Sequence, residues 1–169
     1  MQQNVPASTT SSDTTAQRFR PTLVYSADGE RRTVDGWMRA HGLWRTSLYH
    51  LLQRHPELRL AIDAEAIAFR PTVGNGFAVR LAPDAEGWVV HAGGLTVRFG
   101  EASHAVGIFC AAVSGAARIA VTSAGHGMVD HRLQLADSAG AWVDVVVARD
   151  WCEQALGAVL ANPPLNAPA

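Results

Sequence analysis

From residue 66 to residue 148, short apolar runs alternate with turn-forming residues, and this rhythm limits the folds open to the chain. Glycine, asparagine, proline and aspartate stand between the runs, and each of them favours turns for its own steric or hydrogen-bonding reason. Gly93-Gly94 is the best hairpin signal, because tight hairpin turns need positive φ angles. The rhythm predicts mostly antiparallel strands at residues 66–70, 77–82, 87–91, 95–99, 118–123, 128–136 and 141–148.

The period of the apolar residues changes between residues 101 and 114, where they cover more than one side of a predicted helix. Such a helix is expected to pack on the sheet. A closing amphipathic helix is predicted from residue 151 to residue 160, with its apolar side formed by Trp151, Ala155, Leu156, Val159 and Leu160. The segment 58–62 is compatible with a strand or a helix. The sequence therefore predicts an α+β fold, a mostly antiparallel sheet with one or two helices packed on it.

Two short helices with a tight turn between them are predicted in the stretch 33–59, which reads TVDGWMRAHGLWRTSLYHLLQRHPELR. The first runs from about residue 34 to 41 and ends at Gly42, which can adopt positive φ after a helix. The second starts near residues 44–46 and ends before Pro56, because proline moves the preceding residue out of the α region. Two helices joined at a glycine make a helix-turn-helix unit.

The segment HGLWRTSLYHLL resembles the helix-turn-helix of resolvase-type, transposase-type and small phage regulators. Met38 stands where that family prefers alanine, and Trp44 stands where a serine usually caps the second helix. The resemblance implies a regulator that places its second helix in the DNA major groove. It covers about 27 residues, and we recognise no family for the rest of the chain. The positions that match in order are Gly42, Leu43, Arg45, Thr46, Ser47, Leu48 and Tyr49.

Within this interpretation, the candidate DNA contacts fall into two groups. Side chains on the exposed side of the second helix would reach base edges or nearby phosphates. Arginines around the two helices would neutralise backbone phosphates. The first group is Arg45, Thr46, Ser47 and His50. The second group is Arg31, Arg32 and Arg39.

The charge is distributed unevenly along the chain, although the net charge is only −1. Residues 18–59 contain eight arginines and four acidic residues, which is about +4. Residues 60–161 contain six arginines and ten acidic residues, which is about −4. This asymmetry fits a basic binding module attached to an acidic body, and it equally fits ordinary solvated surfaces.

The alternative is that the helical pair packs Trp37 and Trp44 on the sheet and contacts no DNA. The protein would then be a non-catalytic α+β protein that binds another protein or a small ligand.

For DNA binding we expect a homodimer built on the sheet, because one module alone gives a small footprint.

We predict no catalytic site, no metal site and no cofactor. His126, Asp130 and His131 form the closest candidate metal cluster, but neighbouring residues of a strand point to opposite faces, and His131 is expected on the core side. The sequence contains neither a nucleophile elbow nor a phosphate-binding loop. Cys110 and Cys152 are expected to be buried thiols.

The expected organisation is a disordered tail at residues 1–19, a helix-turn-helix-like module at 20–59, an α+β domain at 60–161 and a flexible tail at 162–169. No stretch is long and apolar enough to predict a membrane span. The N-terminus has no apolar signal segment, so we expect a location in the cytoplasm of a bacterium or of a cell that carries its phage.

Overall fold

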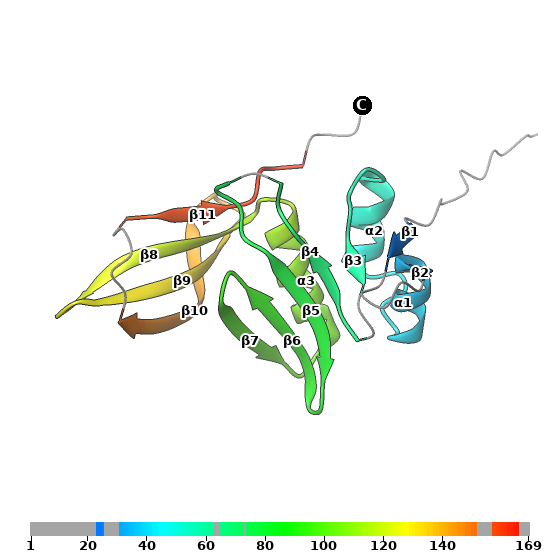
Figure 1. The fold of residues 1–169 in the computed structure, drawn as a ribbon, viewed down its shortest axis with the longest axis horizontal. Coiled ribbons are helices and arrows are strands. Elements are labelled where there is room, and N and C mark those ends of the chain that lie inside the picture. Colours follow the sequence, from blue (N-terminus) through cyan, green and yellow to red (C-terminus); the bar gives the residue numbers. More distant parts are fainter. Residues whose placement is uncertain (1–22, 26–30, 63–64, 73, 152–156, 166–169) are drawn as a thin grey trace, which may run out of the picture.

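The computed structural model describes residues 23–25, 31–62, 65–72, 74–151 and 157–165. Within these residues it contains three helices, a five-stranded sheet, a four-stranded sheet and a pair of short strands (Figure 1). All strand pairs are antiparallel. The predicted α+β fold is confirmed. Among the three helices, none combines the length and the hydropathy that a membrane span requires.

The five-stranded sheet follows the order of the chain. Its strands are β3 (Ala61–Ile62), β4 (Ile67–Phe69), β5 (Val79–Asp84), β6 (Gly87–Ala92) and β7 (Leu95–Phe99). The segment 58–62, which the sequence left open between a strand and a helix, therefore ends in a short strand. Gly93 and Gly94 close the β6–β7 hairpin with φ angles of 52° and 91°, as this turn requires.

Helix α3 (Ala102–Val113) packs on the inner face of the five-stranded sheet and also contacts β8. Phe109 of α3 is fully buried in the same hydrophobic cluster as Leu81 and Val90 of the sheet. The helix is apolar on most sides because it packs on both sheets and on α2. The prediction of a helix at residues 101–114 is confirmed.

The four-stranded sheet has the order β10-β9-β8-β11. Its strands are β8 (Ala117–Gly125), β9 (Met128–Ala136), β10 (Trp142–Trp151) and β11 (Val159–Ala161). The long β8–β9 hairpin extends away from the rest of the molecule (Figure 1). Strands β10 and β11 form the two edges of this sheet.

The predicted closing helix at residues 151–160 is wrong at both of its ends. Trp151 is the last residue of β10, Val159–Ala161 is β11, and residues 152–156 lie outside the described residues. Gly157 adopts a φ of 84° and donates its N–H to the carbonyl of Val121 at 3.0 Å. Pairing with β8 thus outweighs a spacing of apolar residues that also suits a helix.

The helical pair belongs to the same core as the sheets. Its helices are α1 (Val34–Ala40) and α2 (Ser47–Arg54), and the short pair β1 (Leu23–Tyr25) and β2 (Arg31–Thr33) precedes them. The rings of Trp37 on α1 and Trp88 on β6 lie 6.3 Å apart in an edge-to-face arrangement. One continuous cluster of buried residues therefore joins α1 and α2 to α3 and the sheets.

Asn162 lies inside the folded body, although the sequence placed it at the start of a flexible tail. It is 2% exposed, accepts a hydrogen bond from the N–H of Phe77 at 2.9 Å, and donates to the carbonyl of Ala112 at 2.9 Å. Gly115 lets the chain approach at this point, since a Cβ there would come within 2.8 Å of the Asn162 carbonyl. Residues 166–169 lie outside the described residues.

Candidate nucleic-acid interface

A tight turn joins α1 to α2. Gly42 adopts a φ of 68°, a conformation that costs glycine little. Leu43 is fully buried and donates its N–H to the carbonyl of Met38 at 2.7 Å. The turn is therefore held by a main-chain hydrogen bond and by a leucine anchored in the core.

Helix α2 has one buried side and one solvent-facing side. Leu48 and Leu52 are 0% and 2% exposed and fix the helix on the core. Figure 1 shows α2 at one end of the molecule, beside α1. The helix contains no acidic residue. The exposed positions on its solvent side are Ser47, His50, Gln53 and Arg54.

Two of the four predicted base contacts lie outside the helix. Arg45 is exposed, but it lies in the turn with a φ of 72°, and Thr46 is the N-cap residue. The Thr46 hydroxyl donates to the carbonyl of Leu43 at 2.7 Å and makes no side-chain cap bond to the helix. The expectation that all four share one helix face is therefore wrong, because the helix starts only at Ser47.

Sequence reasoning missed Gln53 and Arg54 as exposed residues of α2. For Arg54 the spacing along the chain was a usable signal. Arg54 follows Ser47 by seven positions and His50 by four, and these spacings place all three residues on one side of a helix. The Gln53 amide donates to the Tyr49 hydroxyl at 2.7 Å.

Arg39 is held at the surface between two partners. Its guanidinium carbon lies 3.7 Å from the centre of the Trp44 ring, a cation–π arrangement. Its Nε lies 3.3 Å from the Asp35 carboxylate, one turn earlier on α1. Trp44 is half-buried and packs its ring 4.6 Å from that of Tyr49. Trp44 thus contacts Arg39 and Tyr49 at the surface and is absent from the buried core.

Arg31 and Arg32 are placed only through their backbone. They lie in β2, opposite Tyr25 and Val24 of β1, directly before the first residue of α1. Their side chains lie outside what the structure describes. Both remain candidate phosphate contacts.

A groove of about 270 Å³ runs along the contact between α2 and the C-terminal part of α3. Ser47, His50 and Arg54 line it from α2, and Cys110 and Ser114 line it from α3. Burial raises the pKa of the Cys110 thiol to about 11, partly offset by a hydrogen bond with Ser47. The thiol is therefore protonated at neutral pH and is a poor nucleophile. Cys110, which the sequence predicted to be buried, is half-buried. Cys152 lies outside the described residues.

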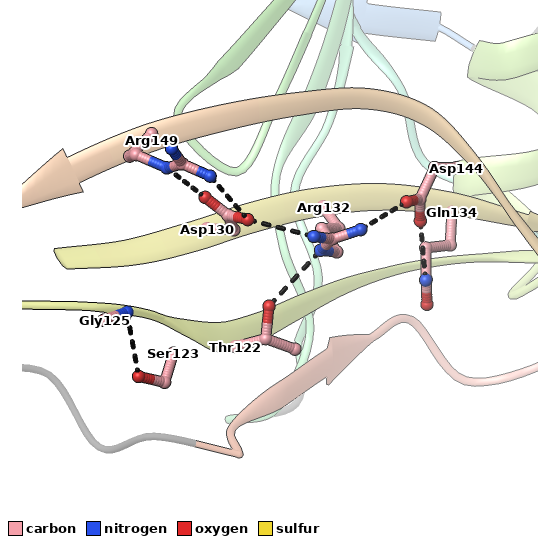
Figure 2. A network of polar contacts seen from close by, with 8 residues as sticks. All are labelled: Thr122, Ser123, Gly125, Asp130, Arg132, Gln134, Asp144 and Arg149. Atoms are coloured by element: carbon pink, nitrogen blue, oxygen red, sulfur yellow. Dashed lines mark hydrogen bonds and ion pairs between the residues drawn. The ribbon is translucent and has the colours of Figure 1, made fainter.

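A second polar arrangement crosses the four-stranded sheet (Figure 2). Asp130 on β9 is 4% exposed and accepts hydrogen bonds from Arg149 at 2.8 Å and from Arg132 at 2.9 Å. Arg132 also donates to Asp144 on β10 at 2.7 Å. The hydrogen bond from Arg149 lowers the pKa of the Asp130 carboxyl against the opposing effect of burial. The hydrogen bond from Gln134 likewise lowers the pKa of the Asp144 carboxyl.

Asp130 and His131 lie on opposite faces of β9, as the strand alternation predicts. Asp130 pairs with Arg149 on the polar face, whereas His131 lies on the face of Val129 and Leu133 and is half-buried there. His126 lies in the exposed β8–β9 turn. Across the described ranges, no group of three or more His, Cys, Asp and Glu side chains is arranged to hold a metal ion.

Comparison of the chain with protein-family models, with curated proteins and with solved structures gave no significant match.

Proposed function

We propose that the protein binds double-stranded DNA through α1 and α2, with α2 in the major groove. The observation that supports this proposal is the solvent side of α2, which carries Ser47, His50, Gln53 and Arg54 and no acidic residue. Arginine can contact guanine through two hydrogen bonds, and glutamine can contact adenine in the same way.

The surroundings of α2 supply the phosphate contacts in this proposal. Arg45 is exposed in the turn before the helix, and Arg39 is exposed on α1 with its side chain 57% accessible. Arg31 and Arg32 come directly before α1 in the chain. Helix recognition units present the start of the second helix to the bases, and the residues around it to the backbone. A transcriptional or mobile-element regulator in the cytoplasm, acting as a homodimer, fits this arrangement.

A non-catalytic protein-binding role is the second candidate, and Trp37 favours it. This residue is 4% exposed and packs against Trp88 of β6, so α1 is part of the common core. A helical pair built into the core can serve as a structural element without contacting DNA. The two candidates differ in what the exposed side of α2 does.

A titration of the full chain against labelled duplex DNA at two salt concentrations tests the proposal. We expect the wild-type protein to bind more weakly as salt rises, because arginines displace counterions from phosphates. The double variant His50→Glu/Arg54→Glu should lose binding. Arg70→Glu/His104→Glu is the matched control, because it changes the net charge equally and both residues are exposed outside the helical pair.

Two results would reject DNA binding. One is the absence of binding at low salt. The other is an equal loss of affinity in the control and in the double variant, since that would reflect net charge rather than a site on α2. In either case the protein-binding role becomes the leading candidate.

A further inference from the structure

The exposed large hydrophobic side chains of the described residues lie on the two edges of the four-stranded sheet. Trp142, Val143 and Val147 are 36%, 54% and 43% exposed on β10, and Val159 is 48% exposed on β11. Strand β10 has ten residues and is one of the two edge strands of its sheet (Figure 1). In the ranges that the structure describes, no strand pairs with its outer edge. An open edge of this kind is a template for pairing with another strand.

The register of β10 on β9 reveals an internal symmetry. Asp144 lies opposite Gln134, Val147 opposite Arg132 and Arg149 opposite Asp130. Since these three β9 residues are evenly spaced, Asp144 and Arg149 lie equally far from Val147, on either side of it and on the same face of the sheet. The irregularity between Asp144 and Val146 produces this symmetry, because it accommodates one extra residue in β10.

We propose that a second copy of the chain pairs with β10 through its own β10, antiparallel, about a two-fold axis at Val147. Val147 then lies opposite Val147 of the second copy. Asp144 of each copy lies opposite Arg149 of the other, so the interface contains two reciprocal pairs of opposite charge. Cross-strand pairs of opposite charge stabilise antiparallel strands, and like charges at these positions destabilise them.

The charged residues remain available for this contact. The Asp144 side chain is 34% exposed, and that of Arg149 is 58% exposed, although both take part in the network with Arg132 and Asp130 (Figure 2). A carboxylate has about four acceptor sites and a guanidinium has five donors. Each can therefore add a partner across the interface without losing the partner within its own chain.

The charge pattern of β10 favours a second copy over an unrelated strand. An unrelated strand would need a basic side chain opposite Asp144 and an acidic side chain opposite Arg149. A second copy supplies both from its own Arg149 and Asp144. The contact is isologous, and it closes as a dimer instead of growing into a fibre.

The dimer would leave the proposed DNA-binding surface free. Strand β10 lies on one side of the five-stranded sheet and α2 lies on the other (Figure 1). This inference therefore deepens the homodimer part of the proposed function, and it is tested without DNA, so the two can fail separately.

Sedimentation equilibrium of the full chain provides the first test. We expect a dimer for the wild type and for Val159→Asp, which changes the opposite edge of the sheet. Val147→Asp places two carboxylates face to face at the axis, so we expect its dissociation constant to rise at least about tenfold, equivalent to about 1.4 kcal/mol. Near-UV circular dichroism should show that both variants are folded. A monomeric wild type, or a Val147→Asp variant that dimerises like wild type, would overturn the proposal.

The second test uses the charge pairs. In a dimer of Asp144→Arg, the new arginine of each copy lies opposite Arg149 of the other copy. In a dimer of Arg149→Asp, the new aspartate of each copy lies opposite Asp144 of the other copy. Each variant alone should therefore dimerise poorly. An equimolar mixture of the two restores opposite charges at both positions and should form a heterodimer. Because any damage to the network within one chain persists in the mixture, recovery can come only from contact between copies. If the mixture stays monomeric while the wild type dimerises, the interface lies elsewhere.

Discussion

The Nε atom of Arg149 on β10 lies 2.8 Å from the Oδ1 atom of Asp130 on β9, although the two residues are 19 positions apart in the chain. The contact joins the edge strand to its neighbour. It also allows the Asp130 carboxylate to be buried, with only 4% of the residue exposed, because a buried carboxylate needs charged partners. The pair therefore holds the polar face of the four-stranded sheet in register.

Asp130→Asn should destabilise the fold at neutral pH and have less effect in acid. The pKa of the Asp130 carboxyl is lowered from its ordinary value in the folded protein, chiefly by the hydrogen bond from Arg149. The stabilisation is thus present above the pKa of the unfolded chain and is lost as the pH falls through the folded pKa. Urea unfolding at neutral and at acidic pH measures the difference. Glu86→Gln, in an exposed turn, is the control, and a pH-independent loss in Asp130→Asn would argue against the ion pair.

Trp37→Ala should cost far more stability than Trp44→Ala. Trp37 is 4% exposed against Trp88 and His41, and large-to-small changes in a core cost about 3–5 kcal/mol for tryptophan. Trp44 is half-buried beneath Arg39, where a cation–π contact contributes about 1 kcal/mol. Denaturant unfolding of both variants checks this order. Equal losses would mean that Trp44 also belongs to the core.

Asn162→Ala should destabilise the protein by about 1–3 kcal/mol, because it leaves buried groups of Phe77 and Ala112 without a partner. The side chain of Asn75 is exposed nearby, so Asn75→Ala serves as the control. Thermal unfolding of the two variants gives the comparison. If Asn162→Ala unfolds at the same temperature as the wild type, the chain around residue 162 does not contribute to the stability of the folded body.

Arg45, Arg54 and Arg39 should differ in how their loss affects DNA binding. If Arg54 contacts a base, its change to alanine costs about 1–3 kcal/mol at the preferred site and reduces the preference among sequences. If Arg39 and Arg45 contact phosphates, Arg39→Ala and Arg45→Ala each weaken binding to all sequences and lower the salt slope by about one. Titrations with selected and random duplexes distinguish the two. Identical behaviour of all three variants would indicate unspecific attraction.

Local pattern was sufficient for most of the elements. The spacing of apolar residues around Phe109 predicted α3, and Gly93-Gly94 predicted the β6–β7 hairpin, because each depends on residues that are close together in the chain. Arg45 shows the limit for the candidate interface. Helical periodicity placed it on α2, but its positive φ places it in the turn, which only the path of the backbone reveals.

The sequence by itself determined where strands, turns and the central helix form, since periodicity and turn chemistry are properties of neighbouring residues. The tertiary structure decided which distant residues meet. Pairing with β8 made residues 159–161 a strand instead of a helix end, and the packing of Asn162 on Phe77 brought a supposed tail into the core. The burial of Asp130 between two arginines and the symmetry of β10 about Val147 depend on strand register. Register arises from contacts between residues far apart in the chain, and no local pattern encodes it.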